Sequence, residues 1–325
     1  MTALAALAAL AVLAALCALG LLGAAALTTR LARRAEAALP PAGRFIEVPG
    51  ARLHVVEAGE LHDGRPPILM LHGLAGQLHH FRYSLVDALA QDTRVVAVDR
   101  PGSGYSTRER DRATTLEEQA DAIAALMDHL GFDRALLVGH SLGGALSLAV
   151  ALRHPTRVTG LALLAPLTTM PSDPPEVFRS LQVPHLLRSL IARTVAIPAF
   201  VSRREALMRI VFGPEDAPGD YARRGGGLLS LRPQQFLSAA EDYAAVPRSL
   251  LTLENRYDEL AREPAAPLPI AVLYGREDRV LDYRPQGEGF AARVPHVRLE
   301  LVSGGHMLPV TQPARCAEFS RTSAW

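Results

Sequence analysis

Residues 135–144 constrain this chain most, because they join three local patterns that few arrangements satisfy together. An apolar run over 135–138 predicts a short strand that is buried on both faces. The letters G-H-S-L-G at 139–143 then fit the pattern G-x-S-x-G, and from Leu142 onward the apolar residues take helical spacing. Strand, tight turn and helix in this order are typical of a nucleophile elbow, which exposes the hydroxyl of Ser141. The same letters also arise by chance in ordinary turns, so the rest of the chain must decide.

Strands and helices alternate on both sides of this segment. The predicted strands are 44–48, 52–57, 68–71, 94–98, 135–138, 161–164, 269–274 and 297–302. Helical spacing lies between several of them, for example over 81–89 and after Thr115. This alternation favours an α/β fold with a mostly parallel, doubly wound, eight-stranded sheet.

Changes of pattern divide the chain into five parts. An apolar helix at 1–29 and a Pro- and Ala-rich linker at 30–43 precede the first part of the core, at 44–165. Over 166–267 clean strands are missing and short helical stretches recur, which predicts an inserted helical cap before the core resumes at 268–325. We expect the apolar cap residues to form mostly the cap's own core and partly the roof of a pocket. They are Leu186, Leu187, Leu190, Ile191, Phe200, Leu228, Leu229 and Phe236.

Residues 3–27 carry no charge and are almost entirely Ala, Leu and Val. As a helix they would extend for roughly 37 Å, enough to cross a hydrocarbon core of about 30 Å as a single-pass membrane anchor. The alternative is a cleaved signal peptide, which would have a basic residue before the apolar stretch and a shorter apolar region. Arginines at 30, 33 and 34 follow the segment, so the positive-inside rule favours a cytoplasmic body. A cleaved signal would instead place the body in the periplasm or outside the cell.

The net charge and the spacing of potential metal ligands bear on two classes of partner, nucleic acids and metal ions. A net charge of +1 gives no support for nucleic-acid binding. His79 and His80 are adjacent, but no carboxylate or cysteine nearby has the spacing of metal ligands. We therefore expect these histidines at a solvated helix start, and we expect neither a metal nor another cofactor. The oligomeric state is left open.

Polar residues follow the predicted strands at the edge where ligands bind in an open parallel sheet. Ser141, Asp278 and His306 each follow such a strand. Acyl transfer needs a nucleophile, a base that takes its proton and a group that orients the base, and these three residue types supply them. Asp282 and, less favourably, Glu277 are alternatives for the orienting acid.

Two backbone N–H groups are candidates to stabilise an oxyanion. One belongs to Leu142, directly after the serine at a helix N-terminus, and the other to Leu74, in the loop after the first buried strand. Because the backbone donates, leucine side chains are compatible with this duty. The residues expected to support the site structurally are His72, Gly73, Gly139, Gly143 and Asp99.

Five motifs, in this order along the chain, resemble the α/β-hydrolase superfamily, specifically its cap-bearing serine hydrolases. The motifs are His72–Gly73–x–x–Gly76, Asp99–Arg–Pro–Gly102–x–Gly104–x–Ser106, Gly139–His–Ser141–Leu–Gly–Gly144, Gly275–x–x–Asp278 and Gly–Gly–His306. The resemblance covers roughly residues 44–320. It implies Ser141 as nucleophile, Asp278 as triad acid and His306 as base, in the chain order expected of the superfamily. It also implies Leu74 and Leu142 as oxyanion donors.

The resemblance further implies a reaction. Haloalkane dehalogenases and epoxide hydrolases carry Asp at the elbow, whereas this chain has Ser141. Met307 after the histidine and Leu74 after His–Gly differ from the aromatic residues usual in C–C bond hydrolases and haloperoxidase-like members, which remain alternatives. A small-molecule carboxylic ester, apolar or lipid-like as a monoacylglycerol is, is the leading substrate. An alternative of another class is a slow or non-catalytic protein that binds a small ligand in the same fold.

Overall fold

The computed structural model describes residues 2–62, 64–109, 112–173, 176–261 and 267–323. Its helices and strands are α1 (Thr2–Ala38), β1 (Arg44–Val48), β2 (Ala51–Ala58), β3 (Ile68–Leu71), α2 (His79–Arg82), α3 (Leu85–Leu89), β4 (Val95–Val98), β5 (Thr107–Arg108), α4 (Leu116–Leu130), β6 (Ala135–His140), α5 (Leu142–Arg153), β7 (Val158–Leu164), α6 (His185–Arg193), α7 (Ala196–Phe212), α8 (Pro233–Glu254), α9 (Tyr257–Ala261), β8 (Ile270–Gly275), α10 (Gly289–Arg293), β9 (Arg298–Val302), α11 (Leu308–Thr311) and α12 (Pro313–Thr322). Short 3₁₀ turns lie at Pro155–Arg157, Glu176–Leu181 and Gly227–Leu231, and one π turn lies at Arg284–Glu288.

The strands of the described ranges form one nine-stranded sheet, in the order β1-β2-β4-β3-β6-β7-β8-β9, with β5 paired to β2. The hairpin β1–β2 is antiparallel and joins β4 antiparallel, and every pair from β4 to β9 is parallel. The predicted α/β class and mostly parallel sheet are confirmed. The prediction missed only β5, because two residues, Thr107 and Arg108, form no apolar run that could signal a strand.

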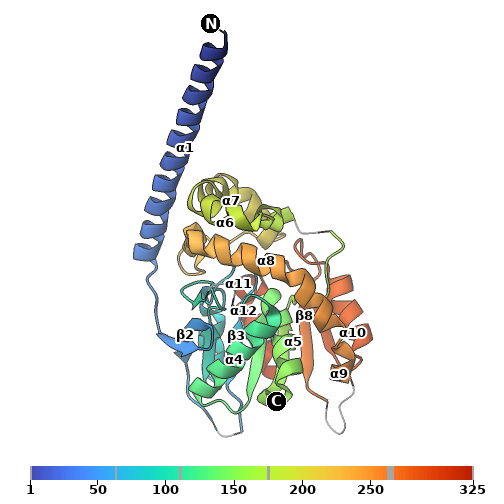
Figure 1. The fold of residues 1–325 in the computed structure, drawn as a ribbon. Coiled ribbons are helices and arrows are strands. Elements are labelled where there is room, and N and C mark those ends of the chain that lie inside the picture. The colour runs from blue at the N-terminus through green and yellow to red at the C-terminus, as the bar shows by residue number, and fades with distance from the viewer. Residues whose placement is uncertain (1, 63, 110–111, 174–175, 262–266, 324–325) are drawn as a thin grey trace.

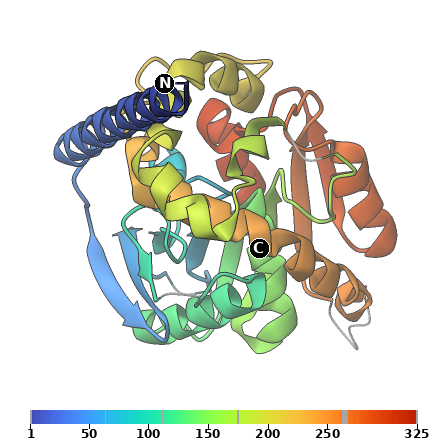
Figure 2. The same ribbon diagram turned by 45° about the horizontal axis from the view of Figure 1, so that its top comes forward.

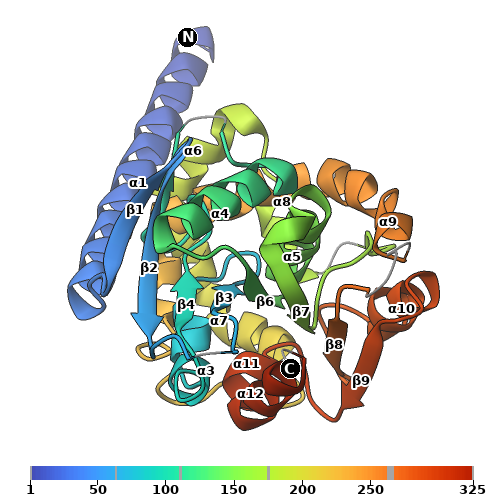
Figure 3. The same ribbon diagram turned by 90° about the horizontal axis from the view of Figure 1, so that it is seen from below.

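Alternate residues of the central strands face two hydrophobic cores. In β4, Val96 and Val98 pack into the core shared with α4 and α5, whereas Val95 and Ala97 pack into the core shared with α3 and α12. Figure 3 shows α4 and α5 on one side of the sheet and α3, α11 and α12 on the other. Side chains alternate along a strand, so a helix layer on each face buries every residue of the continuous apolar runs.

The segment between β7 and β8 contributes α6, α7, α8 and α9, with α6 and α7 outermost over α8 (Figure 1). Its own buried core is small and is formed by Leu181, Ala239 and Ala240. The expectation that the leucines of α6 would be cap core is wrong: Leu186 is 90%, Leu187 47% and Leu190 53% exposed. The reason is that α6 is an outer helix, and no described element covers this face.

Helix α1 is longer than predicted, because it continues without a break to Ala38, so residues 30–38 are helical instead of a linker. The first prolines after it, Pro40 and Pro41, are where the chain leaves the helix. Its last turns contact the body: the Thr28 hydroxyl donates to Thr194 O (2.9 Å), and Arg232 pairs with Glu36 (2.8 Å). The preceding turns project away from the body (Figure 1). Within the described residues, this is the one helix long and apolar enough to cross a membrane.

Candidate active site

Ser141 lies in a strained turn between β6 and α5, with φ 54° and ψ −120°. A positive φ is uncommon for a residue with a side chain and is tolerated only where the surroundings enforce it. The neighbouring glycines make room for the turn, since a Cβ at Gly139 would lie 2.5 Å from both Gly143 O and Ser147 Oγ. A Cβ at Gly143 would collide with the backbone of Leu71. The strand–turn–helix pattern therefore has the geometry of a nucleophile elbow.

Asp278 and His306 meet although 28 positions separate them. His306 Nδ1–H donates to Asp278 Oδ2 (2.7 Å), and Oδ1 of the same carboxylate accepts the N–H groups of Val280 (2.7 Å) and Leu281 (2.9 Å). The Asp278 side chain is 1% exposed. Since the carboxylate is fixed by these donors, it orients the imidazole and leaves His306 Nε2 as the nitrogen available for proton transfer.

Ser141 and His306 line one pocket, together with Leu74 and His140. Among the residues described, no hydrogen bond joins Ser141 Oγ to His306, a contact that often tightens only when substrate is bound. His140 contacts His306 instead: its Nε2–H donates to His306 O (2.9 Å), and the two rings lie 4.9 Å apart. Burial lowers the pKa of His140 well below its usual value, with the neighbouring His306 adding to the effect, so His140 is neutral.

The alternative acids have other duties. Glu277 accepts the N–H of Gly304 (2.6 Å) and so holds the loop that carries His306. Asp282 accepts the N–H of Arg284 (3.0 Å), and its side chain is 53% exposed. Neither carboxylate contacts His306 within the described part of the chain.

Asp99 braces the loop that follows β4. Its Oδ1 accepts Leu78 N–H (2.7 Å), and its Oδ2 accepts Tyr105 N–H (2.9 Å) and pairs with His54 Nδ1 (2.7 Å). The side chain is 1% exposed. These three partners occupy the carboxylate, which agrees with a structural role for Asp99.

Both expected oxyanion donors border the serine. Leu142 is the first residue of α5, and Gly73, directly before Leu74, is so close that a Cβ there would lie 2.9 Å from Ser141 Cβ. Neither Leu74 N–H nor Leu142 N–H donates a hydrogen bond to another described residue. Two free N–H groups beside a serine hydroxyl are what an oxyanion hole requires.

His79 and His80 are buried, at 5% and 8% exposure, so the expectation of a solvated helix start is wrong. Burial lowers the pKa of each to about 4, because the charged imidazole loses its hydration. His80 lines the pocket and its Nε2 accepts the hydroxyl of Tyr221 (3.1 Å). No group of three or more potential metal ligands occurs within the described ranges.

The pocket above the serine has a volume of about 1530 Å³. Apolar side chains from the cap form much of its wall, as expected for Ile191, Phe200, Leu228 and Phe236. Leu31 of α1 also lines it, so the N-terminal helix contributes to the pocket. A space of this size and apolar character can receive a substrate with a long hydrocarbon part.

Sequence reasoning missed three supporting residues. Glu215 accepts Gly305 N–H (3.0 Å) and so helps to hold the His306 loop. Arg100 and Asp242 form a buried ion pair (2.9 Å) behind the loop of residues 72–74. Arg100 could have been noticed, since it follows a predicted strand within the Asp99 motif, but its partner lies 142 positions away and no local pattern marks it.

Comparison with known proteins shows several similar chains. The dihydrolipoyllysine-residue acetyltransferase component of the acetoin cleaving system from Pseudomonas putida is 40% identical over 131 residues, covering 40% of this chain. The match covers 34% of that protein, so this chain spans about a third of its length. Haloalkane dehalogenase 2 from Mycobacterium tuberculosis is 29% identical over 296 residues, covering 86% of this chain and 93% of that protein.

A solved structure of a membrane phospholipase A superposes with a TM-score of 0.64 at 24% identity, covering 98% of this chain and 96% of that one. At this identity the likeness concerns the fold alone. Residues 66–313, most of the chain, match the family defined by the alpha/beta hydrolase fold. The chain therefore belongs to the α/β hydrolase family.

Proposed function

We propose that this chain is a serine hydrolase that cleaves carboxylic esters, with Ser141, His306 and Asp278 as its catalytic triad. The observation that carries the proposal is one shared pocket. A serine in a strained elbow and an imidazole already oriented by a buried carboxylate both face it. Membership of a family of hydrolases supports the same reaction class.

The residues would act in the following order. His306 Nε2 takes the proton of Ser141 Oγ as that oxygen attacks the ester carbonyl carbon. The N–H groups of Leu74 and Leu142 donate to the oxyanion of the tetrahedral intermediate, and Asp278 stabilises the imidazolium. The imidazolium then gives its proton to the departing alcohol, and a water molecule activated by His306 hydrolyses the acyl-enzyme to the acid.

An apolar, lipid-like ester is the substrate class that we favour. The pocket wall is largely apolar. Leu31, which lines the pocket, belongs to α1, and the residues before it in this helix form the long apolar stretch. We propose that residues 3–27 anchor the protein in a membrane, with the body on the cytoplasmic side as the arginines at 30, 33 and 34 favour. The exposed leucines of α6 support attachment to a membrane, because α6 lies beside α1 on the outer side of the cap (Figure 2).

The test compares wild type with Ser141→Ala in the full chain, solubilised in detergent. A fluorophosphonate probe labels an activated serine, so wild type is expected to be labelled and Ser141→Ala is not. Hydrolysis of p-nitrophenyl butyrate should fall by a factor of about 10³ or more in the variant. Ser202→Ala, which removes an exposed hydroxyl on α7, is the matched control and should keep both properties.

Retained turnover in Ser141→Ala would refute the assigned nucleophile. A wild-type protein that is folded but neither labelled nor active would support the non-catalytic ligand-binding alternative. A panel of esters with acyl chains of increasing length would test the substrate class, since the apolar pocket predicts higher kcat/KM for longer chains.

A further inference from the structure

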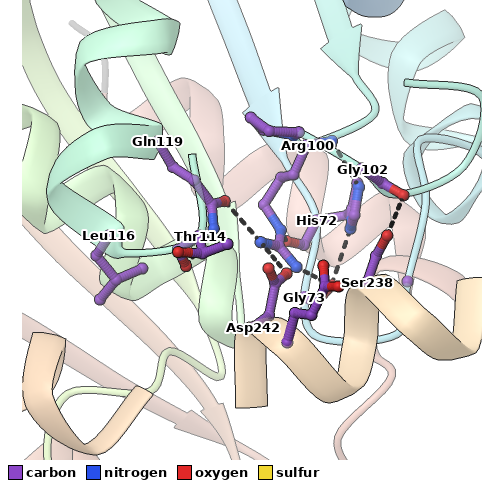
Figure 4. A network of polar contacts seen from close by, with 12 residues as sticks. His72, Gly73, Arg100, Gly102, Thr114, Leu116, Gln119, Ser238 and Asp242 are labelled. Carbon is purple, nitrogen blue, oxygen red and sulfur yellow. Dashed lines mark hydrogen bonds and ion pairs between the residues drawn. The ribbon is translucent and has the colours of Figure 1, made fainter. Parts of the chain in front are cut away.

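Arg100 is a fully buried cation directly behind the loop that carries Leu74. Its Nε donates to His72 O (2.9 Å) and its Nη2 donates to Gly73 O (3.2 Å). Its Nη1 donates to Gln119 Oε1 (2.8 Å) and to Asp242 Oδ2 (2.9 Å). Figure 4 shows the guanidinium between the loop and helix α8. A buried charge is stable only when it is paired and its donors are satisfied, and this arrangement meets both conditions.

Asp242 of α8 is the counter-ion, with a side chain that is 1% exposed. Its second oxygen accepts a hydrogen bond from Arg108 Nη1 (2.6 Å), so two arginines share one carboxylate. Because α8 belongs to the segment inserted between β7 and β8, these ion pairs attach the cap to the core. The Asp242 carboxylate therefore couples the position of α8 to the position of the Arg100 guanidinium.

The peptide group between Gly73 and Leu74 is held by its oxygen. Gly73 O accepts hydrogen bonds from Arg100 Nη2, from His72 Nδ1–H (2.8 Å) and from Gly76 N–H (3.2 Å). In a trans peptide the C=O and N–H bonds point in opposite directions. Fixing the oxygen toward Arg100 therefore turns the N–H of Leu74 to the opposite side of the peptide plane.

His72 also holds the Gly73 carbonyl. We call the hydrogen bonds that Gly73 O accepts from Arg100 and His72 the clamp on Gly73 O. Its Nε2 accepts the backbone N–H of Arg100 (2.9 Å), so Nδ1 carries the proton that it donates to Gly73 O. Burial lowers the pKa of His72 well below its usual value, and the charge of Arg100 adds to the effect, so the ring is neutral. A neutral ring of this tautomer is the form that satisfies both hydrogen bonds.

We propose that Arg100 is a positioning residue for the oxyanion hole: it fixes the Gly73–Leu74 peptide so that Leu74 N–H faces the reacting carbonyl, and Asp242 of the cap holds Arg100 in that position. The inference rests on the serine hydrolase function proposed above. It predicts that a perturbation of the cap helix at Asp242 reaches the oxyanion hole through one guanidinium, without any contact between Asp242 and substrate.

The competing explanation is that the ion pairs only hold α8 in place. Arg108 distinguishes the two, because it also binds Asp242 and pairs with Glu241 (2.7 Å) on α8. Its other donors go to Pro101 O and Ala113 O (both 3.2 Å) and to Ser238 O (3.3 Å). None of these acceptors is in the loop of residues 72–74. Arg108→Gln therefore weakens the attachment of α8 while it leaves the clamp on Gly73 O intact.

The experiment uses full-length wild type, Arg100→Lys, Asp242→Asn and the control Arg108→Gln. Titration with a fluorophosphonate gives the concentration of competent sites, so that partial misfolding does not count as slow catalysis. For each variant, kcat and KM are measured with p-nitrophenyl butyrate. The Ki of an alkyl trifluoromethyl ketone is also measured, because its hemiketal oxygen tests the oxyanion hole.

Removing one oxyanion donor typically costs about 10²–10³ in kcat, so a misplaced donor should cost about 10- to 100-fold in Arg100→Lys. A lysine ammonium cannot bridge both carbonyls as the planar guanidinium does. Asp242→Asn should lose about tenfold, with KM nearly unchanged in both variants. The Ki of the ketone should rise in proportion to the fall in kcat/KM, and Arg108→Gln should stay within about threefold of wild type for each titrated site.

Wild-type kcat per titrated site in Arg100→Lys and Asp242→Asn would overturn the assignment of Arg100. The same would follow if Arg108→Gln lost as much as Arg100→Lys, because attachment of the cap would then explain the effect. Both outcomes presuppose that wild type is labelled and active. A wild type that fails both tests would instead refute the proposed function.

Discussion

Asp278→Asn is the sharpest test of the proposed chemistry, because the structure dictates how the amide must orient. Val280 N–H and Leu281 N–H, at 2.7 and 2.9 Å, both need an acceptor and will hold the amide oxygen. The amide NH₂ then faces His306 Nδ1, which has to accept a hydrogen bond where it now donates one at 2.7 Å. This forces the proton of the neutral imidazole onto Nε2 and leaves no lone pair there to take the proton of Ser141.

The wrong tautomer should lower kcat by a factor of about 10³–10⁴, which corresponds to about 4–5.5 kcal/mol of transition-state stabilisation. The assay is p-nitrophenyl butyrate hydrolysis at pH 7.5, with thermal unfolding as a check that the isosteric variant is folded. Asp282→Asn is the matched control, since that exposed carboxylate makes no contact with His306 among the described residues, and it should stay within about twofold. Asp278→Asn with more than a tenth of wild-type kcat would refute the reasoning, as would an equal loss in Asp282→Asn.

Three further predictions concern stability and lipid. For His79 and His80 the pKa is about 4 in the folded protein against an ordinary 6.5, so the unfolded chain binds more protons between these values. The free energy of unfolding should therefore fall as the pH drops from 6.5 toward 4, by up to about 1.4 kcal/mol per pH unit for each histidine. Urea titrations across this range check it, and replacing both histidines with Asn should make the slope shallower. Thr115→Ala removes the capping box of α4 and should cost about 1 kcal/mol in the same urea assay, with no change in kcat. Replacing Leu186 and Leu190 with Ser should slow hydrolysis of a long-chain monoacylglycerol in vesicles but spare p-nitrophenyl butyrate; equal effects on both would contradict the membrane placement of α6.

Much of the fold could be predicted because its signals are local. The central strands are continuous apolar runs, and each is followed by helical spacing, so the two-faced burial of a parallel sheet is written into short windows such as 68–71 and 135–138. The positions of Ser141, Asp278 and His306 were also predictable, because a topological rule places residues after parallel strands at one edge. The hydrogen bond from His306 to Asp278 agrees with that prediction.

The errors share a physical cause. Whether Leu186 is buried depends on what packs over α6, and the burial of His79 depends on the elements around α2, so neither is visible in the local sequence. The ion pair between Arg100 and Asp242 joins segments 142 positions apart, and no periodicity reports such a pairing. The linker at 30–43 was predicted from composition, but over 30–38 alanine and arginine favour helix, and no proline interrupts them before Pro40.

The unbroken course of α1 has a mechanical consequence. A helix of 37 residues is about 56 Å long and resists bending, so α1 is a rigid connection and not a flexible tether. The C-terminal part of α1 contacts the body through Thr28 and Glu36, which lie on either side of the pocket-lining Leu31. Any contact that fixes the first turns of α1 would therefore set the tilt and rotation of the α/β body. The direction in which the pocket opens is thus dictated from the beginning of the chain.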